Sequence, residues 1–270
     1  MTLGCAGGIV RPVSIRRWSV ARIALIAVAS MGILAGCVGV SPGATASVGS
    51  PNPTVADLAQ IRAEIESQYA GQLLAIGEEA TTVMVRFRST AAASAAELLA
   101  RYGSKVDISV GLFPYPAPSG SANGCAGIIG PLIDPGPLRA TIELPSRTVG
   151  HDAAFMATVR LTNAGSRTMT VETGQPLTIV LYQPDGTIPV GLAAGAAGGT
   201  GLEFRLEPGA SSSIPAAGGT SSCDLALGYE LPDGPYVARA AVEIDRTDPS
   251  INAARGVFLS EPLSITVATP

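Results

Sequence analysis

The chain has 270 residues and a formal net charge of −4, from 17 basic and 21 acidic residues. Four of the basic residues and none of the acidic ones precede Cys37, so the rest of the chain is the more acidic part. Because phosphate binding needs clustered Lys and Arg, this balance argues against a nucleic-acid-binding protein. It also offers no electrostatic attraction to anionic lipids.

The first 36 residues have the organisation of an export signal. Arg11, Arg16, Arg17 and Arg22 precede an uncharged, mostly apolar run at 23–34. This run is shorter than the roughly 20 residues that span a bilayer, so we expect a cleaved signal peptide and no permanent membrane helix. The paired arginines leave open whether export uses the general secretory or the twin-arginine route.

The signal ends in Leu34-Ala35-Gly36-Cys37, which resembles the lipobox of bacterial lipoproteins. In that family the signal is cut before the cysteine, and the cysteine then carries acyl chains such as palmitate. The resemblance implies cleavage between Gly36 and Cys37 and lipidation of Cys37. Two or three acyl chains anchor a protein stably, whereas one gives marginal binding. We therefore expect a lipid anchor on the extracytoplasmic face of the cell membrane; the alternative is an ordinary signal peptide with an incidental cysteine.

A flexible tether and a small α/β module are predicted next. Residues 37–53 are uncharged and rich in Gly, Ser, Pro and Ala, a composition that cannot bury a core. Residues 54–70 show helical spacing of apolar side chains, with Thr54 as N-cap and Asp57 in the first turn. The apolar stripe of this helix comprises Val55, Leu58, Ile61, Ile65 and Tyr69.

Two strands and a second helix complete the predicted module, which spans residues 54–113. Residues 81–89 alternate, with Val83, Val85 and Phe87 on one face and Met84, Arg86 and Arg88 on the other. Residues 90–103 are Ala-rich and end at Gly103, which predicts a helix with a glycine C-cap. Residues 105–113 alternate again. The order is therefore α-β-α-β.

A linker is predicted at 114–137, where six prolines and five glycines prevent regular structure. Cys125 lies within it. Once Cys5 is removed with the signal and Cys37 is lipidated, Cys125 and Cys223 are the remaining thiols of an exported chain. An oxidising location favours one disulfide between them, which would hold the linker against the following domain.

From residue 138 to 270 the pattern changes to short strands separated by turn sequences such as Pro184-Asp-Gly and Glu207-Pro-Gly. Alternating strands without helices between them predict an antiparallel β-sandwich. The predicted strands are 139–145, 154–163, 168–173, 177–183, 202–207, 224–231, 236–244 and 263–269. The fold class is thus an α+β module followed by an all-β sandwich.

Turn sequences in this region carry a second resemblance. The strand end Leu161-x-Asn163, the turn Leu206–Ser211 and the hairpin Pro232–Tyr236 resemble those of the Ig-like sandwich in bacterial proteinase-inhibitor domains of the BsuPI type. The match covers roughly residues 139–245 and consists mainly of turn residues. It implies an Ig-like fold, and we do not extend it to inhibitory activity.

No catalytic, metal or cofactor motif is found. His151 is the single histidine, and no G-x-S-x-G sequence accompanies it, so we interpret it as a surface loop residue. Zinc-ligand spacing, a P-loop and G-x-G-x-x-G are missing from the sequence. The nearest carboxylate clusters, Glu78-Glu79 and Asp245–Asp248, are typical of solvated turns. The small-residue loop 192–201 is typical of a flexible crossover, although its backbone could also approach a ligand.

These observations favour a non-enzymatic, lipid-anchored envelope protein with a binding or scaffolding role. Its expected partners are the membrane, through Cys37, and an envelope protein. One alternative is a proteinase inhibitor or another Ig-like module that modulates an enzyme. A second alternative is an enzyme with a dispersed carboxylate site, because such acids can come from distant strands.

Overall fold

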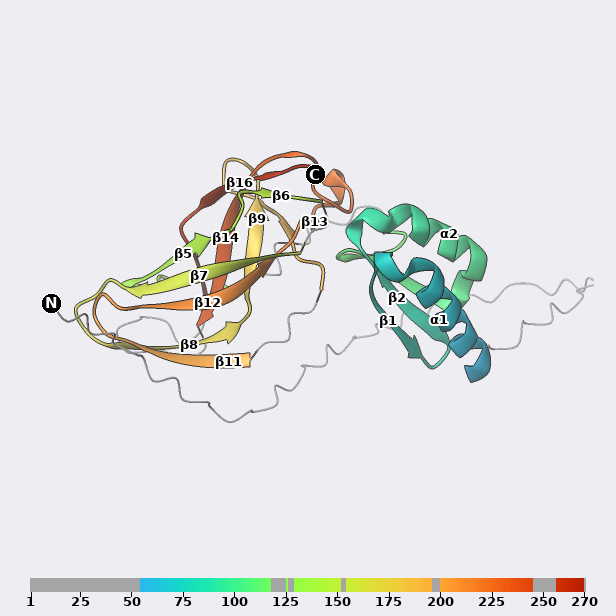
Figure 1. The fold of residues 1–270 in the computed structure, drawn as a ribbon, viewed down its shortest axis with the longest axis horizontal. Coiled ribbons are helices and arrows are strands. Elements are labelled where there is room, and N and C mark those ends of the chain that lie inside the picture. Colours follow the sequence, from blue (N-terminus) through green and yellow to red (C-terminus); the bar gives the residue numbers. More distant parts are fainter. Residues whose placement is uncertain are drawn as a thin grey trace, which may run out of the picture. The chain divides into compact units, whose positions relative to one another are not determined.

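A computed structural model describes residues 54–117, 125, 129–151, 154–195, 200–244 and 256–269. The described residues belong to one compact unit and are mostly β-sheet, with two α-helices near the start (Figure 1). The predicted signal peptide, Cys37 and the tether lie outside the described residues.

The first helix, α1 (Val55–Tyr69), begins where the sequence predicts it. Thr54 and Asp57 form a reciprocal capping box, in which Asp57 N donates to Thr54 Oγ1 and Thr54 N donates to Asp57 Oδ2. The hydrogen bonds that Thr54 N and Thr54 Oγ1 donate to Asp57 Oδ2 lower the pKa of this carboxyl. Leu58, Ile61, Ile65 and Tyr69 are buried, as predicted. Val55 is 75% exposed, so its place in the buried stripe was predicted wrongly.

The N-terminal sheet has four strands in the order β1-β2-β3-β4. Its elements along the chain are β1 (Leu73–Glu79), β2 (Thr82–Phe87), α2 (Ala92–Tyr102), β3 (Val106–Val110) and β4 (Phe113–Pro114). The sequence predicted β2, α2 and β3, with Gly103 as the C-cap of α2, but missed β1 and β4. Residues 73–79 form a nearly continuous apolar run followed by two acids, so they lack the alternation that identifies a half-buried strand.

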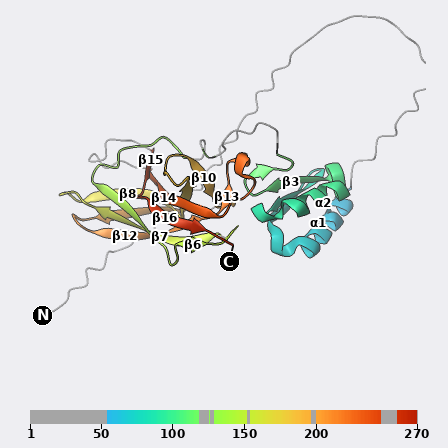
Figure 2. The same cartoon turned by 90° about the horizontal axis from the view of Figure 1, so that it is seen from above.

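Both helices lie on the same side of this sheet (Figures 1 and 2). The alternating residues of β2 and β3 that face them form one buried core with the apolar sides of α1 and α2. Because side chains alternate along a strand, Met84, Arg86, Asp107 and Ser109 project from the opposite face, which the helices leave open.

The C-terminal β-region, residues 129–269, contains a large mixed sheet with the strand order β5-β7-β12-β9-β14-β16-β6. Three short strands, β10, β13 and β15, join it beside this path. The bounds are β5 (Leu138–Glu143), β6 (Thr148–Val149), β7 (Phe155–Asn163), β9 (Leu177–Tyr182), β10 (Pro189–Leu192), β12 (Ser211–Gly218), β13 (Ser221–Ser222), β14 (Gly234–Ile244), β15 (Gly256–Leu259) and β16 (Leu263–Val267).

A separate pair of strands, β8 (Met169–Gln175) and β11 (Thr200–Leu206), packs against this sheet (Figure 1). Met169, Val171 and Leu206 of the pair share one core with inward residues of β7, β9, β12, β14 and β16. The large sheet therefore supplies most of the apolar core of the β-region, and the pair adds to it.

The β-region differs from the sequence prediction in its pairing, at one predicted strand and in strands that the sequence missed. The pairing is not purely antiparallel, because β12 pairs with β9, and β16 with β6, in parallel. The predicted strand 224–231 is instead a turn that contains a short 3₁₀ helix, Leu225–Leu227, and ends at Gly228 with φ +89°. That positive φ is unfavourable for a continuing strand. The sequence also missed β12, whose Ser, Ala, Gly and Pro215 are typical of turns.

Asn163 joins two turns at one end of the β-region. Its side chain is fully buried; Nδ2 donates to the carbonyl oxygens of Arg167 at 2.7 Å and Leu206 at 3.0 Å. Its Oδ1 accepts from Gly165 N at 2.9 Å. Three hydrogen bonds thus satisfy the buried amide and fix the turn after β7 against the end of β11.

Candidate functional site

The open face of the N-terminal sheet carries a groove of about 690 Å³. Six residues, which project from or lie on that face of β1, β2 and β3, form its floor: Ala75, Gly77, Met84, Arg86, Asp107 and Ser109. We call this cavity the groove. Its volume falls in the range of about 300–1,000 Å³ that is usual for small-molecule sites.

The floor of the groove combines small residues with the long side chain of Met84. Gly77 faces Met84 across the β1–β2 pair, and a Cβ added at Gly77 would meet the Met84 methyl at 3.8 Å. Met84 is 39% exposed, which is high for a large apolar side chain. An accessible methionine on a strand offers an adaptable apolar surface to a ligand.

Arg86 and Asp107 give the groove one charge of each sign. Arg86 lies beside Ser109, and Met84 lies beside Asp107, in the parallel β2–β3 pairing. Both charged side chains are exposed, and among the described residues neither takes part in an ion pair. These two charges are therefore available to a bound molecule.

The turn between β3 and β4 supplies an apolar wall through Leu112, Phe113 and Pro114. Gly111 starts this turn with φ +57°, and a Cβ there would lie 3.2 Å from Ser89 Cβ. A side chain at residue 111 would thus meet both backbone strain and crowding. Gly195, from the small-residue loop noted in the sequence, also lines the groove.

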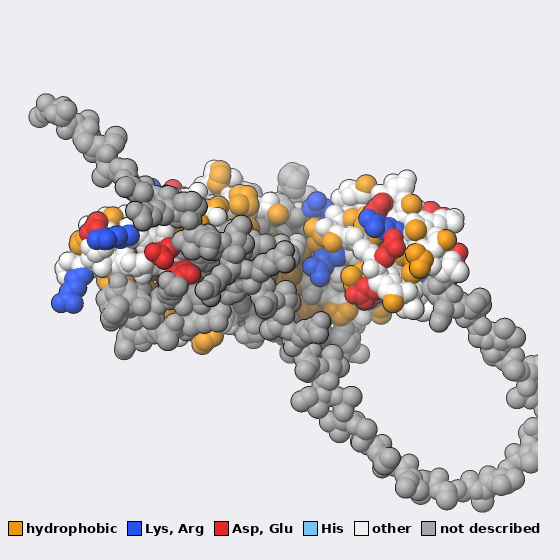
Figure 3. Space-filling view, turned by 90° about the horizontal axis from the view of Figure 1, so that it is seen from below, with side chains coloured by type: hydrophobic (Ala, Val, Ile, Leu, Met, Phe, Trp, Pro, Cys, Tyr) orange, Lys and Arg blue, Asp and Glu red, His pale blue; other side chains and the backbone are white. Residues whose placement is uncertain are grey.

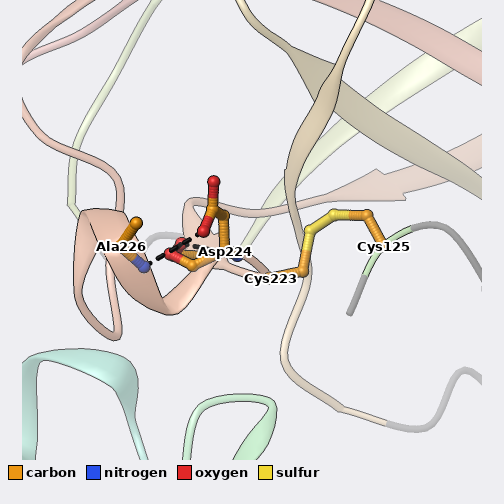
Figure 4. Close-up of a disulfide and its surroundings, with 5 residues drawn as sticks. Cys125, Cys223, Asp224 and Ala226 are labelled. Carbon is orange, nitrogen blue, oxygen red and sulfur yellow. Dashed lines mark hydrogen bonds between the residues drawn. A yellow bond between two sulfur atoms is a disulfide. The ribbon is translucent and has the colours of Figure 1, made fainter. Parts of the chain in front are cut away.

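Cys125 and Cys223, the predicted disulfide pair, are bonded through their sulfur atoms (Figure 4). Their Cα atoms are 5.3 Å apart, which is within the usual range for a disulfide. Both cysteines are buried in a small apolar cluster with Leu192, and Leu112 packs against it. Because Leu112 also lines the groove, the disulfide supports one of its walls.

His151 lies in a turn, where its side chain is 20% exposed and sits between two acids. Its Nε2 is 2.7 Å from Asp233 Oδ1, and its Nδ1 is 3.6 Å from Glu230 Oε2. The hydrogen bond to His151 is the main cause of a lowered pKa at Asp233. Among the described residues, no serine or cysteine side chain is hydrogen-bonded to this imidazole. The arrangement lacks the nucleophile that a triad requires.

Neither of the two acidic clusters noted in the sequence forms part of the groove floor as the structure describes it. Glu78 and Glu79 are at the end of β1, where Glu78 forms an ion pair with Arg62 at 3.6 Å. Asp245–Asp248 lie outside the described residues. Within the described ranges, no group of three or more His, Cys, Asp and Glu side chains is placed to hold a metal ion.

Surface charge on the described residues is mixed. On the face shown in Figure 3, acidic and basic side chains lie interspersed among apolar ones. Such a surface does not select a partner by one sign of charge. Among the described helices, none is both long and apolar enough to cross a bilayer.

No protein family and no curated protein matches the chain. Solved structures with a similar arrangement include the CARDB domain of a Pyrococcus furiosus protein, at 14% identity and TM-score 0.27, covering 50% of this chain and 96% of that one. The C-terminal domain of wzt has 9% identity and TM-score 0.29, with coverages of 50% and 75%. A Listeria innocua β-glucosidase has 7% identity and TM-score 0.27; the match covers 48% of this chain and only 16% of that enzyme. At these values the likenesses carry no functional argument.

The sequence predicted that Met84 and Arg86 share one face of their strand and that residues 105–113, which include Asp107, alternate, but it did not identify these residues as a site. The signal was present in β2, where a methionine and an arginine occupy the face opposite three buried residues. The prediction lacked β1 and β4, which provide the remaining floor and part of the wall.

Proposed function

We propose that this protein is a lipid-anchored envelope protein that binds a ligand in the groove without transforming it. The observation that carries the proposal is the groove itself, a cavity of about 690 Å³ with apolar lining and two charged side chains. Mostly apolar pockets with a few polar groups are the usual form of ligand sites.

The N-terminal sheet and the C-terminal β-region would have separate roles. The helix-backed N-terminal sheet presents the groove, and the C-terminal β-region acts as an Ig-like module that supports it. The lipobox-like Leu34–Cys37 sequence supports anchoring through Cys37, and the uncharged residues 38–53 would let the folded part stand away from the membrane.

The absence of catalysis is part of the proposal. Arg86, Asp107 and Ser109 in the groove are not joined by hydrogen bonds that would activate a nucleophile, among the described residues. The one imidazole of the chain belongs to a different place, between Glu230 and Asp233. The carboxylate of Asp107 is the one group in the groove that could act as a base, and among the described residues no hydrogen bond joins it to Ser109.

A photo-crosslinking experiment tests the binding role. A benzophenone amino acid replaces Met84 in the groove or, as a matched control, Met156 of β7, which is 56% exposed. The two full-length variants are produced in the native host and irradiated in intact cells. We expect adducts at residue 84 and none at residue 156. Equal labelling at both positions, or no adduct at residue 84, would contradict a binding role for the groove.

A further inference from the structure

The open face of the N-terminal sheet presents opposite charges in two successive rows. In one row, Arg86 of β2 lies beside Ser109 of β3, so a guanidinium and a hydroxyl can both donate hydrogen bonds. In the next row, Met84 lies beside Asp107, whose carboxylate accepts them. One row is therefore suited to an anion and the other to a cation.

The separation of the rows sets the length of a matching ligand. Asp107 and Ser109 are two residues apart on one strand, so the rows are about 6.6 Å apart. An extended chain spans about 3.3–3.6 Å for each residue. The free ammonium and carboxylate groups of an extended dipeptide are thus separated by about the same distance as the two rows.

The apolar parts of the groove flank these charges. Met84 rises beside Asp107, and Leu112 and Phe113 form the wall at the β3–β4 turn. On the β1 side, the small residues Gly77 and Ala75 leave space above the sheet for a ligand. Apolar side chains of a ligand would contact these surfaces while its charged ends meet the two rows.

From this geometry we infer that the groove binds short peptides with free termini and apolar side chains, a conclusion that rests on the binding role proposed above. The terminal carboxylate pairs with Arg86 and Ser109, and the terminal ammonium pairs with Asp107. Dipeptides fit the row spacing best.

Charge complementarity favours this class over other amphipathic molecules. A fatty acid would pair with Arg86 but would place its alkyl chain against the carboxylate of Asp107, which would lose hydration without a compensating partner. A polyanion such as a phosphate ester would be repelled by Asp107. A zwitterionic peptide satisfies both charges.

Calorimetric titration of the full chain, purified in detergent, tests the inference with Leu-Leu as the probe. Leu-Leu amide lacks the carboxylate, N-acetyl-Leu-Leu lacks the ammonium, and Gly-Gly lacks the apolar side chains. We expect Leu-Leu to bind at least about tenfold more tightly than each of the three, which is the effect of about 1.4 kcal/mol. Equal affinity for Leu-Leu and its amide would overturn the assignment, whatever the variants do.

Two variants assign the contacts. In Arg86→Gln, affinity for Leu-Leu should fall at least about tenfold, to that of the amide, and the difference between the two ligands should disappear. In Asp107→Asn, the difference between Leu-Leu and N-acetyl-Leu-Leu should disappear instead. Arg147→Gln and Glu261→Gln, at exposed positions of the β-region, are the charge-matched controls and should bind as the wild type does.

The outcomes separate this inference from the proposed function. If the crosslinker at residue 84 captures a ligand but Leu-Leu does not bind, the groove binds another class of molecule and the peptide assignment is wrong. If neither capture nor titration shows binding, both proposals fail. Loss of binding in the control variants as well would show that the charges of the groove do not select the ligand, and would overturn the assignment.

Discussion

The imidazole Nε2 of His151 lies 2.7 Å from Asp233 Oδ1 and joins the turn after β6 to the turn that precedes β14. The same carboxylate oxygen accepts a hydrogen bond from Thr269 N at 3.0 Å, close to the end of the chain. Three segments distant in the sequence therefore meet at one exposed acid.

Asp233 should make stability depend on acid pH. The hydrogen bond from His151, followed by that from Thr269, lowers the pKa of Asp233 below its ordinary value of 3.8. A carboxyl with a lowered pKa in the folded state contributes stability above pH 3.8, and that stability is lost as pH falls through the folded value. Urea unfolding should show wild type more stable than Asp233→Asn at pH 7, with the difference shrinking below pH 3.8. A difference that stays constant from pH 7 to pH 2 would contradict this.

His151 should not support hydrolysis, because no serine or cysteine among the described residues is hydrogen-bonded to it. We expect His151→Ala to leave any hydrolytic activity of purified protein unchanged against ester and peptide substrates. Circular dichroism serves as the control for folding. A hydrolytic activity that disappears in a folded His151→Ala variant would show that the imidazole is catalytic.

Asn163→Ala should destabilise the β-region. The substitution removes three hydrogen bonds and leaves the carbonyl of Arg167 and the buried carbonyl of Leu206 without these donors. We expect the free energy of unfolding to fall by about 2–4 kcal/mol, as measured by chemical denaturation. Thr162→Ala is the control, because its hydroxyl contact with Ser211 is exposed, and should change the value by less than about 0.5 kcal/mol. Equal effects of the two variants would disprove a special role for the amide.

Breaking the Cys125–Cys223 disulfide should lower stability and expose the predicted linker. The bond closes a loop with a sequence separation of 98 residues. By the chain-entropy argument, a loop of roughly 100 residues contributes up to about 4.7 kcal/mol. Reduction, or the paired change to serine, should lower the melting temperature and make residues 114–137 sensitive to protease. Two free thiols in the oxidised, purified protein would contradict the bond.

Cys37 should determine how the protein partitions between detergent and water. Native protein should enter the detergent phase in a Triton X-114 separation, because two or three acyl chains give stable membrane binding. Cys37→Ala should stay in the aqueous phase. Mass spectrometry provides the direct check, and an unmodified Cys37 in freely soluble wild-type protein would rule out the anchor.

The sequence by itself determined the helices and strands that are specified by residues close together along the chain. The capping pair Thr54 and Asp57, the apolar spacing of α1 and the alternation in β2 each reflect the geometry of one helix turn or one strand. The cysteine pair followed from counting the thiols that remain if the chain is exported and Cys37 is lipidated. These inferences needed no knowledge of which segments lie side by side.

Tertiary structure decided everything that depends on pairing. Strand β12 is poor in residues that favour strands, yet it pairs with β7 and, in parallel, with β9. Pairing with these neighbouring strands outweighs the low intrinsic preference of the β12 residues for a strand. His151 acquires Glu230 and Asp233 as neighbours only when distant turns meet. The groove likewise exists only because the parallel register of β2 and β3 brings Arg86 beside Ser109 and Met84 beside Asp107, and alternation within one strand cannot specify the register of the next.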